Sequence, residues 1–285
     1  MPELATHKFK IRFDGGIANK NLLPLYDGTT SIQGIGQSLQ IATHAFMTGE
    51  IVTRATALRG AHFVIRPARP GSFIVEVIAV IEAYPAMSGI VTAIGAPVFY
   101  DFIKTAFRRA TGDLDAEPET AHLKKIYSRR EPPPLQKPPA DLDELAETLE
   151  GSLQRAHRPI GGGEGVATIE INTPRQQLIE LNANTKDWVN TREEAIGVEV
   201  FTGNVTRYNS LSRNGRAYID QLDRVLPMRP GPDYNSGDLP LLTWSLHGSN
   251  AGLPKKLQFR ARRVSSANGR VKRLLLVDNT RIPET

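Results

Sequence analysis

KKLQFRARRVSSANGRVKRLLLVD, residues 255–278, decides the fold class of the C-terminal part of the chain. Leu257, Phe259 and Ala261 alternate with polar residues, which is the period of a strand that buries one face. An Asn-Gly pair precedes RVKRLLLVD at 270–278, and this dipeptide favours a tight hairpin turn. The stretch is therefore predicted to be a β-hairpin.

Further strands are predicted upstream of this hairpin. They are VEVFTGNVTRYN at 198–209, RAYID at 216–220 and LLTWSLHG at 241–248, with a second Asn-Gly turn in SRNG at 212–215. Short strands at this spacing are typical of a small barrel or a half-open sheet. We expect the β-rich part of the chain to fold as a domain of that kind.

The N-terminal part is predicted to be a small α+β unit. KFKIRF at 8–13 alternates basic and apolar residues like a strand, and 61–67 and 72–81 are two further strands around a turn. Between them, apolar residues within 31–49 recur at helical spacing behind Ser31, a candidate N-cap. Together these elements give a strand, a helix and a hairpin.

The whole chain is accordingly predicted to be α+β with two domains. The N-terminal domain covers residues 1–112 and ends with an apolar helical segment at 83–109. Residues 113–140 include EPPPLQKPPA, whose five prolines predict a semi-rigid linker. The second domain, 141–285, starts with an amphipathic helix. The remaining elements expected before the β-rich part are a glycine turn at 161–165, a strand at 166–172 and a short helix within 173–189, capped by Thr173.

The apolar segment contains AYPAMSGIVTAIGAPVFY, 83–100, which carries no charge. One interpretation is a segment that enters a membrane or lines a pore, because small residues at four-residue spacing let membrane helices approach closely. The residues assigned to that segment are Ser88, Gly89, Thr92, Ala93, Ala96, Phe99 and Tyr100. Basic residues follow the aromatic pair, as at a cytoplasmic membrane interface. The alternative is the buried helix of an ordinary domain, since Asp101 interrupts the apolar run.

The basic residues of the C-terminal part are the second candidate site. No acidic residue occurs between Asp238 and Asp278. The predicted ligand-binding residues are Lys255, Lys256, Arg260, Arg262, Arg263, Arg270, Lys272 and Arg273, with Arg207, Tyr208 and Arg216 from the neighbouring hairpin. Cations on one strand face bind phosphates, and an aromatic side chain beside them can stack a base. The alternative is a solvated basic face that protects a strand edge.

Composition narrows the functional classes. The chain has a formal charge of +5, which favours anionic partners, and it has no cysteine, which excludes disulfides and thiolate chemistry. The six histidines show no metal-ligand spacing, and no nucleophile or phosphate-loop motif is present. We therefore expect no enzymatic activity, no metal and no cofactor. The N-terminus lacks the apolar core that a signal peptide needs.

An apolar helical segment, residues 83–109, followed by a basic β-rich domain with cations at 255–273, resembles membrane effectors of bacterial antiphage defence, in particular the Hailong-type effector subunit. The resemblance implies a homo-oligomeric ion channel controlled by a nucleotide or oligonucleotide. It also implies a nucleotidyltransferase-type partner and a location at the inner membrane with a cytoplasmic C-terminal domain. The alternative function is a cytoplasmic nucleic-acid-binding module in which the apolar helix is core.

Overall fold

A computed structural model describes most of the chain. The described residues are 5–53, 58, 61–66, 73–81, 88–128, 140–163, 165–253, 255–267 and 269–282, with the backbone alone for 5 and 88–94. The chain forms two compact units, Met1–Val189 and Asn190–Thr285, called here the N-terminal unit and the C-terminal unit. The fold is α+β, as predicted.

The N-terminal unit contains a five-stranded antiparallel sheet in the order β2-β3-β1-β4-β5. Its strands are β1 (Ala5–Asp14), β2 (Ala61–Arg66), β3 (Ile74–Ile81), β4 (Thr168–Asn172) and β5 (Gln177–Leu181). Phe9, Ile11 and Phe13 of β1 are buried, whereas Lys8, Lys10 and Arg12 are exposed. The alternation predicted for KFKIRF is therefore confirmed, and one sheet face is covered while the other is open.

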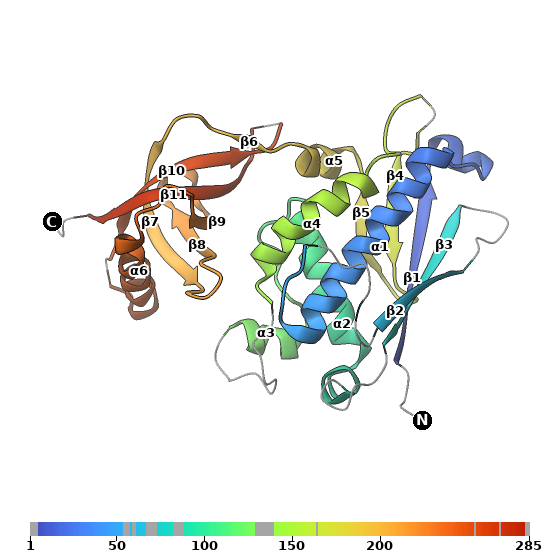
Figure 1. Ribbon diagram of the computed structural model, residues 1–285, viewed down its shortest axis with the longest axis horizontal. Coiled ribbons are helices and arrows are strands. Elements are labelled where there is room, and N and C mark those ends of the chain that lie inside the picture. Colours follow the sequence, from blue (N-terminus) through green and yellow to red (C-terminus); the bar gives the residue numbers. More distant parts are fainter. Residues whose placement is uncertain are drawn as a thin grey trace. The chain divides into compact units, whose positions relative to one another are not determined.

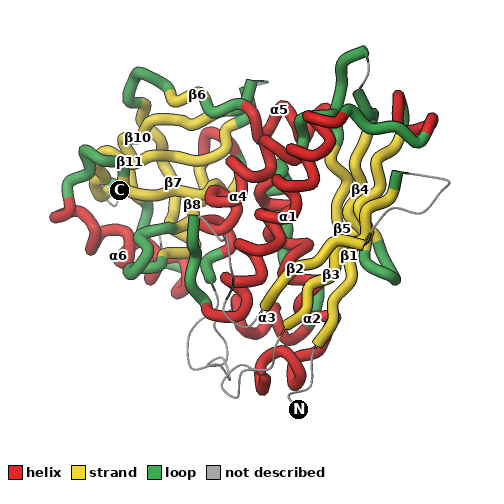
Figure 2. The backbone as a smooth tube through the Cα atoms, turned by 45° about the vertical axis from the view of Figure 1, so that its right-hand side comes forward, coloured by secondary structure: helices red, strands yellow, loops and turns green. Residues whose placement is uncertain are grey.

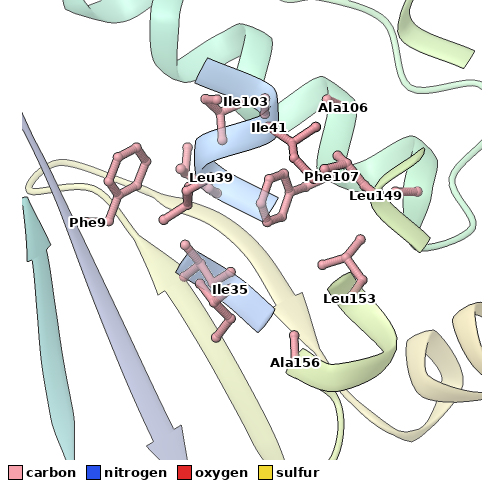
Figure 3. Close-up of a cluster of buried hydrophobic side chains, with 14 of the residues drawn as sticks. Phe9, Ile35, Leu39, Ile41, Ile103, Ala106, Phe107, Leu149, Leu153 and Ala156 are labelled. Atoms are coloured by element: carbon pink, nitrogen blue, oxygen red, sulfur yellow. The ribbon is translucent and has the colours of Figure 1, made fainter. Parts of the chain in front are cut away.

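Helices cover the buried face of this sheet (Figure 1). The helical elements are η1 (Gly16–Lys20), α1 (Leu25–Thr48), α2 (Ser88–Ala110), α3 (Ala121–Tyr127), α4 (Leu142–Ala156) and α5 (Ala183–Asn190). Figure 3 shows the core where they meet: Phe9 of β1, Ile35 and Leu39 of α1, Phe107 of α2 and Leu153 of α4 belong to one buried cluster. Helix α2 is not continuous, because Gly95 has φ 77° and ψ 164° and Pro97 follows it.

The expected domain boundary at 113–140 is not where the compact units divide. Helix α4 packs against α1 and α2, and β4 pairs with β1, so residues beyond 140 complete the N-terminal unit. A Cβ on Gly34 of α1 would lie 2.5 Å from the Ser152 carbonyl oxygen of α4, so glycine is what permits this close packing. The Ser38 and Ser152 hydroxyls share a buried hydrogen bond of 2.7 Å. The predicted proline-rich stretch, 131–140, lies outside the described residues except for its last position.

The C-terminal unit contains a closed barrel. Its elements are β6 (Glu193–Glu194), β7 (Glu199–Tyr208), β8 (Gly215–Ile219), η2 (Asp220–Leu222), β9 (Arg224–Pro230), η3 (Ser236–Asp238), α6 (Leu239–Ala251), β10 (Leu257–Ser265) and β11 (Val271–Arg281). Strands β7, β8 and β9 form an antiparallel meander, β9 pairs in parallel with β11, and β10 closes the barrel between β11 and β7 (Figure 2). The small barrel predicted from the sequence is confirmed.

The topology of this barrel identifies its fold. Counting β7, β8, β9, β10 and β11 as strands one to five, the circular order is 1-2-3-5-4. Strands three and five are parallel, and helix α6 lies between strands three and four in the chain. This is the arrangement of the OB-fold, a five-stranded Greek-key barrel.

Two predicted elements are corrected by the structure. LLTWSLHG belongs to α6 rather than to a strand, because Pro240 opens a helix whose buried residues Leu242, Ser245 and Gly248 recur every three positions. The helix expected within 173–189 is β5 followed by α5. The Thr173 hydroxyl does accept from two backbone N–H groups, of Arg175 and Gln176, but it stabilises a turn between β4 and β5 rather than a helix start.

Candidate nucleic-acid interface

The outward face of β10 carries the basic row that the sequence predicts. Leu257, Phe259 and Ala261 are completely buried, whereas Lys256 and Arg260 are exposed. The period-two assignment is therefore confirmed. Whether the charge of this row is compensated depends on acidic residues elsewhere in the chain.

Four cations of β10 and the residue before it have an acidic partner from another segment. The pairs are Lys256–Asp220 at 2.7 Å, Arg260–Asp278 at 2.6 Å, Arg262–Asp233 at 3.2 Å and Arg263–Glu199 at 2.7 Å. Three of the four acids precede Asp238 in the chain, and the fourth is Asp278 itself. Folding therefore brings acids to cations that have no acidic residue near them within that interval of the sequence.

Two further predicted cations, Lys255 and Lys272, contact other parts of the C-terminal unit. The Lys255 ammonium lies 5.5 Å from the centre of the Trp244 ring, and the Arg281 guanidinium lies 4.6 Å from the same ring. Lys272 is 2% exposed and its Nζ donates to the carbonyl of Thr191. These cation–π contacts and this buried ammonium stabilise the C-terminal unit itself.

A second set of cations lies on the outward face of β7, β8, β9 and β11. On β8, Gly215, Ala217 and Ile219 are buried inside the barrel, so Arg216 and Tyr218 point outward. The same alternation places Arg229 of β9 outward beside buried Leu226 and Met228, and Arg273 of β11 outward beside buried Leu274 and Leu276. Arg207 pairs with Arg216 in the ladder and shares its side of the sheet. We call Arg207, Arg216, Arg229 and Arg273 the arginine face.

The strand register brings the members of the arginine face together. Arg207 lies directly opposite Arg216, and Arg229 lies opposite Leu275, two residues from Arg273. Arg207 and Arg229 are partly exposed, while Arg216 and Arg273 are each 7% exposed.

Two loops border the arginine face. In the loop between β7 and β8, the Asn209 side chain accepts from the backbone of Leu211 at 2.9 Å, and Leu211 and Arg213 are exposed. In the loop between β10 and β11, the Ser266 N–H donates to the carbonyl of exposed Arg270 at 2.9 Å. Both Asn-Gly turns of the sequence are thus the predicted hairpin connections. In OB-folds, the face of strands two and three and these two loops bind oligonucleotides and oligosaccharides.

Tyr208 does not lie on this face. It is 6% exposed and pairs with Gly215 on the interior side of the barrel, and burial raises the pKa of its hydroxyl. A Cβ on Gly215 would meet both the Tyr208 ring and the Met228 methyl group at 3.1 Å, so glycine makes room for them. The expectation that Tyr208 stacks a base is therefore wrong, since its ring is core.

Arg229 of the arginine face and Tyr218 beside it were not among the predicted ligands. Arg229 lies in RVLPMRP, a strand whose two prolines argue against a strand prediction. Leu226 and Met228 nevertheless show the period of two that a strand requires. Tyr218 comes from the predicted strand RAYID, where its position two residues after Arg216 was the available signal. Only the strand pairing shows that four strands contribute cations to one face.

The described side chains of the apolar segment pack within the N-terminal unit. Phe99 is completely buried against His7 and Phe46, and the Tyr100 hydroxyl bonds to the backbone of Lys8. Within the part of the chain that the structure describes, no helix has both the length and the apolar character needed to cross a membrane. The side chains of Ser88, Gly89, Thr92 and Ala93 lie outside the described residues, and Ala96 is exposed. Membrane insertion of this segment stays a prediction.

The basic residues after the segment are also engaged. Arg109 is buried, with its guanidinium bonded to Asp143 at 3.0 Å, Glu117 at 2.8 Å and the carbonyl of Ala116. Lys104 pairs with Glu119 at 2.6 Å. These contacts fold the chain after α2 back onto the N-terminal unit.

The charges of the two units differ. Residues 190–285 contain 15 Lys and Arg against 9 Asp and Glu, a formal charge of +6, whereas residues 1–189 contain 20 against 21. The whole positive excess of the protein therefore belongs to the unit that carries the barrel. This separation favours the barrel as the part that meets a polyanion.

Comparison with known proteins gives one match. No match was found among curated proteins or among solved structures. Residues 9–190 match a family described as a domain of unknown function, DUF7946. The match ends where the compact units divide, so the barrel lies outside the matched residues. Because residues 9–190 are more than half of the chain, the protein belongs to the DUF7946 family.

Proposed function

We propose that the protein is a nucleic-acid-binding protein whose C-terminal barrel holds the phosphate backbone on the arginine face. The observation that carries this proposal is the gathering of four arginines from four strands on one side of an OB-type barrel. Guanidinium groups bind phosphate oxygens with two parallel hydrogen bonds.

The position of the face supports the same function. Arg216 and Arg229 lie on strands two and three of the barrel, and the two bordering loops present Arg213 and Arg270. An oligosaccharide would instead call for acids and amides on this face, while its charged residues are arginines. The packing of Phe99, Phe102 and Phe107 in the core favours a binding protein over a channel.

Fluorescence anisotropy with a labelled 15-nucleotide strand tests this proposal. The test variant is Arg207→Ala with Arg229→Ala, because both side chains are partly exposed and each is expected to contribute about tenfold in affinity. The control is Arg260→Ala, whose cation is paired with Asp278 and is not a member of the arginine face. Loss of binding in the double variant alone supports the proposal. Equal affinity of the double variant and the wild type overturns it.

A further inference from the structure

The proposed function leaves open which form of nucleic acid the barrel takes. Resting on that proposed function, we infer that the ligand is single-stranded and that Tyr218 is the platform on which one of its bases stacks. The inference rests on where the Tyr218 ring lies, on what holds it, and on the surroundings of every other aromatic residue of the C-terminal unit.

Tyr218 lies on the outward side of β8, in line with the arginine face. It follows Arg216 by two residues, so their side chains leave the same side of the strand about 6.7 Å apart. Its neighbours across the ladders are Asn204 and Val225, and its side chain is partly exposed. A guanidinium and an aromatic ring side by side on one strand can engage a phosphate and the base next to it.

The ring is held in place from its far end. The Tyr218 hydroxyl donates to Oδ1 of Asp223, which ends the turn between β8 and β9 with φ 49°. That hydrogen bond and the carboxylate charge raise the pKa of Tyr218, so the phenol stays protonated and keeps the bond. A side chain that is ordered before the ligand arrives loses less conformational entropy on binding.

The other aromatic residues of this unit are engaged elsewhere. Phe201, Tyr208 and Phe259 are buried in the barrel. The Trp244 ring is in cation–π contact with Lys255 and Arg281. Tyr234 bonds through its hydroxyl to Asn279, and burial raises its pKa. Tyr218 is therefore the aromatic residue of residues 190–285 that accompanies the arginine face.

This placement selects the form of the ligand. In a duplex, each base is already stacked on both faces within the helix, and a side chain on a barrel surface reaches phosphates and groove edges instead. An unpaired base offers its flat face, and stacking on an aromatic side chain is tolerant of sequence. A strand with at least one unpaired base is thus the ligand that uses both Tyr218 and its neighbouring cations.

The test compares two strands that differ only in their bases. The full-length protein is titrated with labelled dT15 and with an abasic 15-mer of the same backbone charge, at one salt concentration. The wild type is expected to bind dT15 at least tenfold more tightly than the abasic strand, a difference within the range measured for one stacked base. Tyr218→Leu keeps an apolar side chain of similar reach and should bind both strands equally, and Tyr218→Phe should keep the preference.

The outcomes separate this inference from the proposed function. If the wild type binds both strands equally, or if folded Tyr218→Leu keeps the tenfold preference, the stacking inference is overturned while phosphate binding stands. If the wild type binds neither strand, the proposed function itself fails. Tighter binding of a 15-base-pair duplex than of dT15 also overturns the inference. Circular dichroism verifies the fold of each variant, and Tyr26→Leu, a change at an exposed ring of the N-terminal unit, is the matched control.

Discussion

The hydroxyl of Tyr100 in α2 bonds to both backbone groups of Lys8 in β1, accepting from its N–H at 3.0 Å and donating to its carbonyl at 3.3 Å. Strand β4 pairs with β1 from Lys10 to Asp14 and stops before Lys8. A side chain from the apolar segment thus takes the place of a strand partner. The aromatic residue that would mark a membrane interface in the sequence is here part of a sheet.

Tyr100→Phe removes both of these hydrogen bonds and keeps the ring. The ring still packs on Phe9 and His7, so the loss is confined to the two backbone groups of Lys8. We expect the free energy of unfolding to fall by about 1 kcal/mol, since water can replace part of the lost bonding at this exposed position. Urea denaturation measures the change. A fall no larger than that of the control Tyr26→Phe would show that the bonds contribute nothing.

Arg109→Ala is expected to be far more damaging. The Arg109 side chain is 1% exposed and its partner Asp143 is 8% exposed, so removing the cation leaves a buried carboxylate without its charge partner. Breaking a buried pair in this way costs about 3–5 kcal/mol. Arg109→Lys should rescue little, because a single ammonium cannot reach Asp143, Glu117 and the Ala116 carbonyl together.

The neighbouring residue gives a matched control for that prediction. Arg108 pairs with Asp113 at 2.6 Å, but its side chain is 36% exposed. Arg108→Ala should lower the free energy of unfolding by no more than about 1 kcal/mol, as for other surface pairs. Similar losses for the two alanine variants would mean that the buried network is not a main support of the N-terminal unit.

The sequence predicts those features that depend on neighbouring residues. Alternation in KFKIRF and in β10 identifies the buried faces correctly, and the two Asn-Gly turns identify the hairpins. Strand period and turn preference depend on a few neighbouring residues, so they can be predicted without knowledge of the fold. Helix α6 shows where such local prediction fails. A short apolar run fits both a strand and a helix, and only Pro240 at its start favours the helix.

The candidate site could not be predicted in the same way. The acids that pair with Lys256 and Arg263 are Asp220 and Glu199, 36 and 64 residues away in the chain. The arginine face depends on the parallel pairing of β9 with β11, which no local pattern signals. Charge compensation and the grouping of arginines on one face depend on strand order, which a run of basic residues in the sequence does not reveal.

Acid should weaken the N-terminal unit through His7. This residue of β1 is buried against Phe99 and Tyr100, and burial lowers its pKa from 6.5 to about 4. The unfolded chain therefore binds a proton between pH 6.5 and pH 4 while the folded chain does not. Stability is complete above pH 6.5 and declines as the pH falls towards 4, with a loss from His7 that approaches about 3 kcal/mol.

His7→Phe isolates this contribution. Phenylalanine keeps an aromatic ring among Phe9, Phe99 and Tyr100 and has no proton to bind. Urea denaturation at several pH values from 7 to 4 should give a shallower pH dependence for the variant than for the wild type. His157, whose burial also lowers its pKa to about 4, supplies part of the slope that remains. Parallel curves for wild type and variant would exclude His7 as a source of acid sensitivity.

The barrel can be disturbed independently of the N-terminal unit at Gly203 of β7. This residue pairs with Ile219 of β8 and with Leu257 of β10, and a Cβ added to it would lie 1.9 Å from the carbonyl oxygen of Tyr218. Because the obstacle is backbone and not a flexible side chain, Gly203→Ala must separate β7 from β8. We expect a loss of about 3 kcal/mol or more for the C-terminal unit, at the upper end of overpacking costs.

The two tryptophans of the chain report on the two units, since Trp188 belongs to the N-terminal unit and Trp244 to the C-terminal unit. In a Trp188→Phe background, Gly203→Ala should shift the fluorescence transition to lower urea, whereas in a Trp244→Phe background the transition should stay in place. Gly197→Ala is the control, because nothing lies within 4 Å of a Cβ at that position. Equal shifts of both transitions would mean that the units unfold together. A separate shift means that each core is stable by itself, which two compact units with their own buried residues lead us to expect.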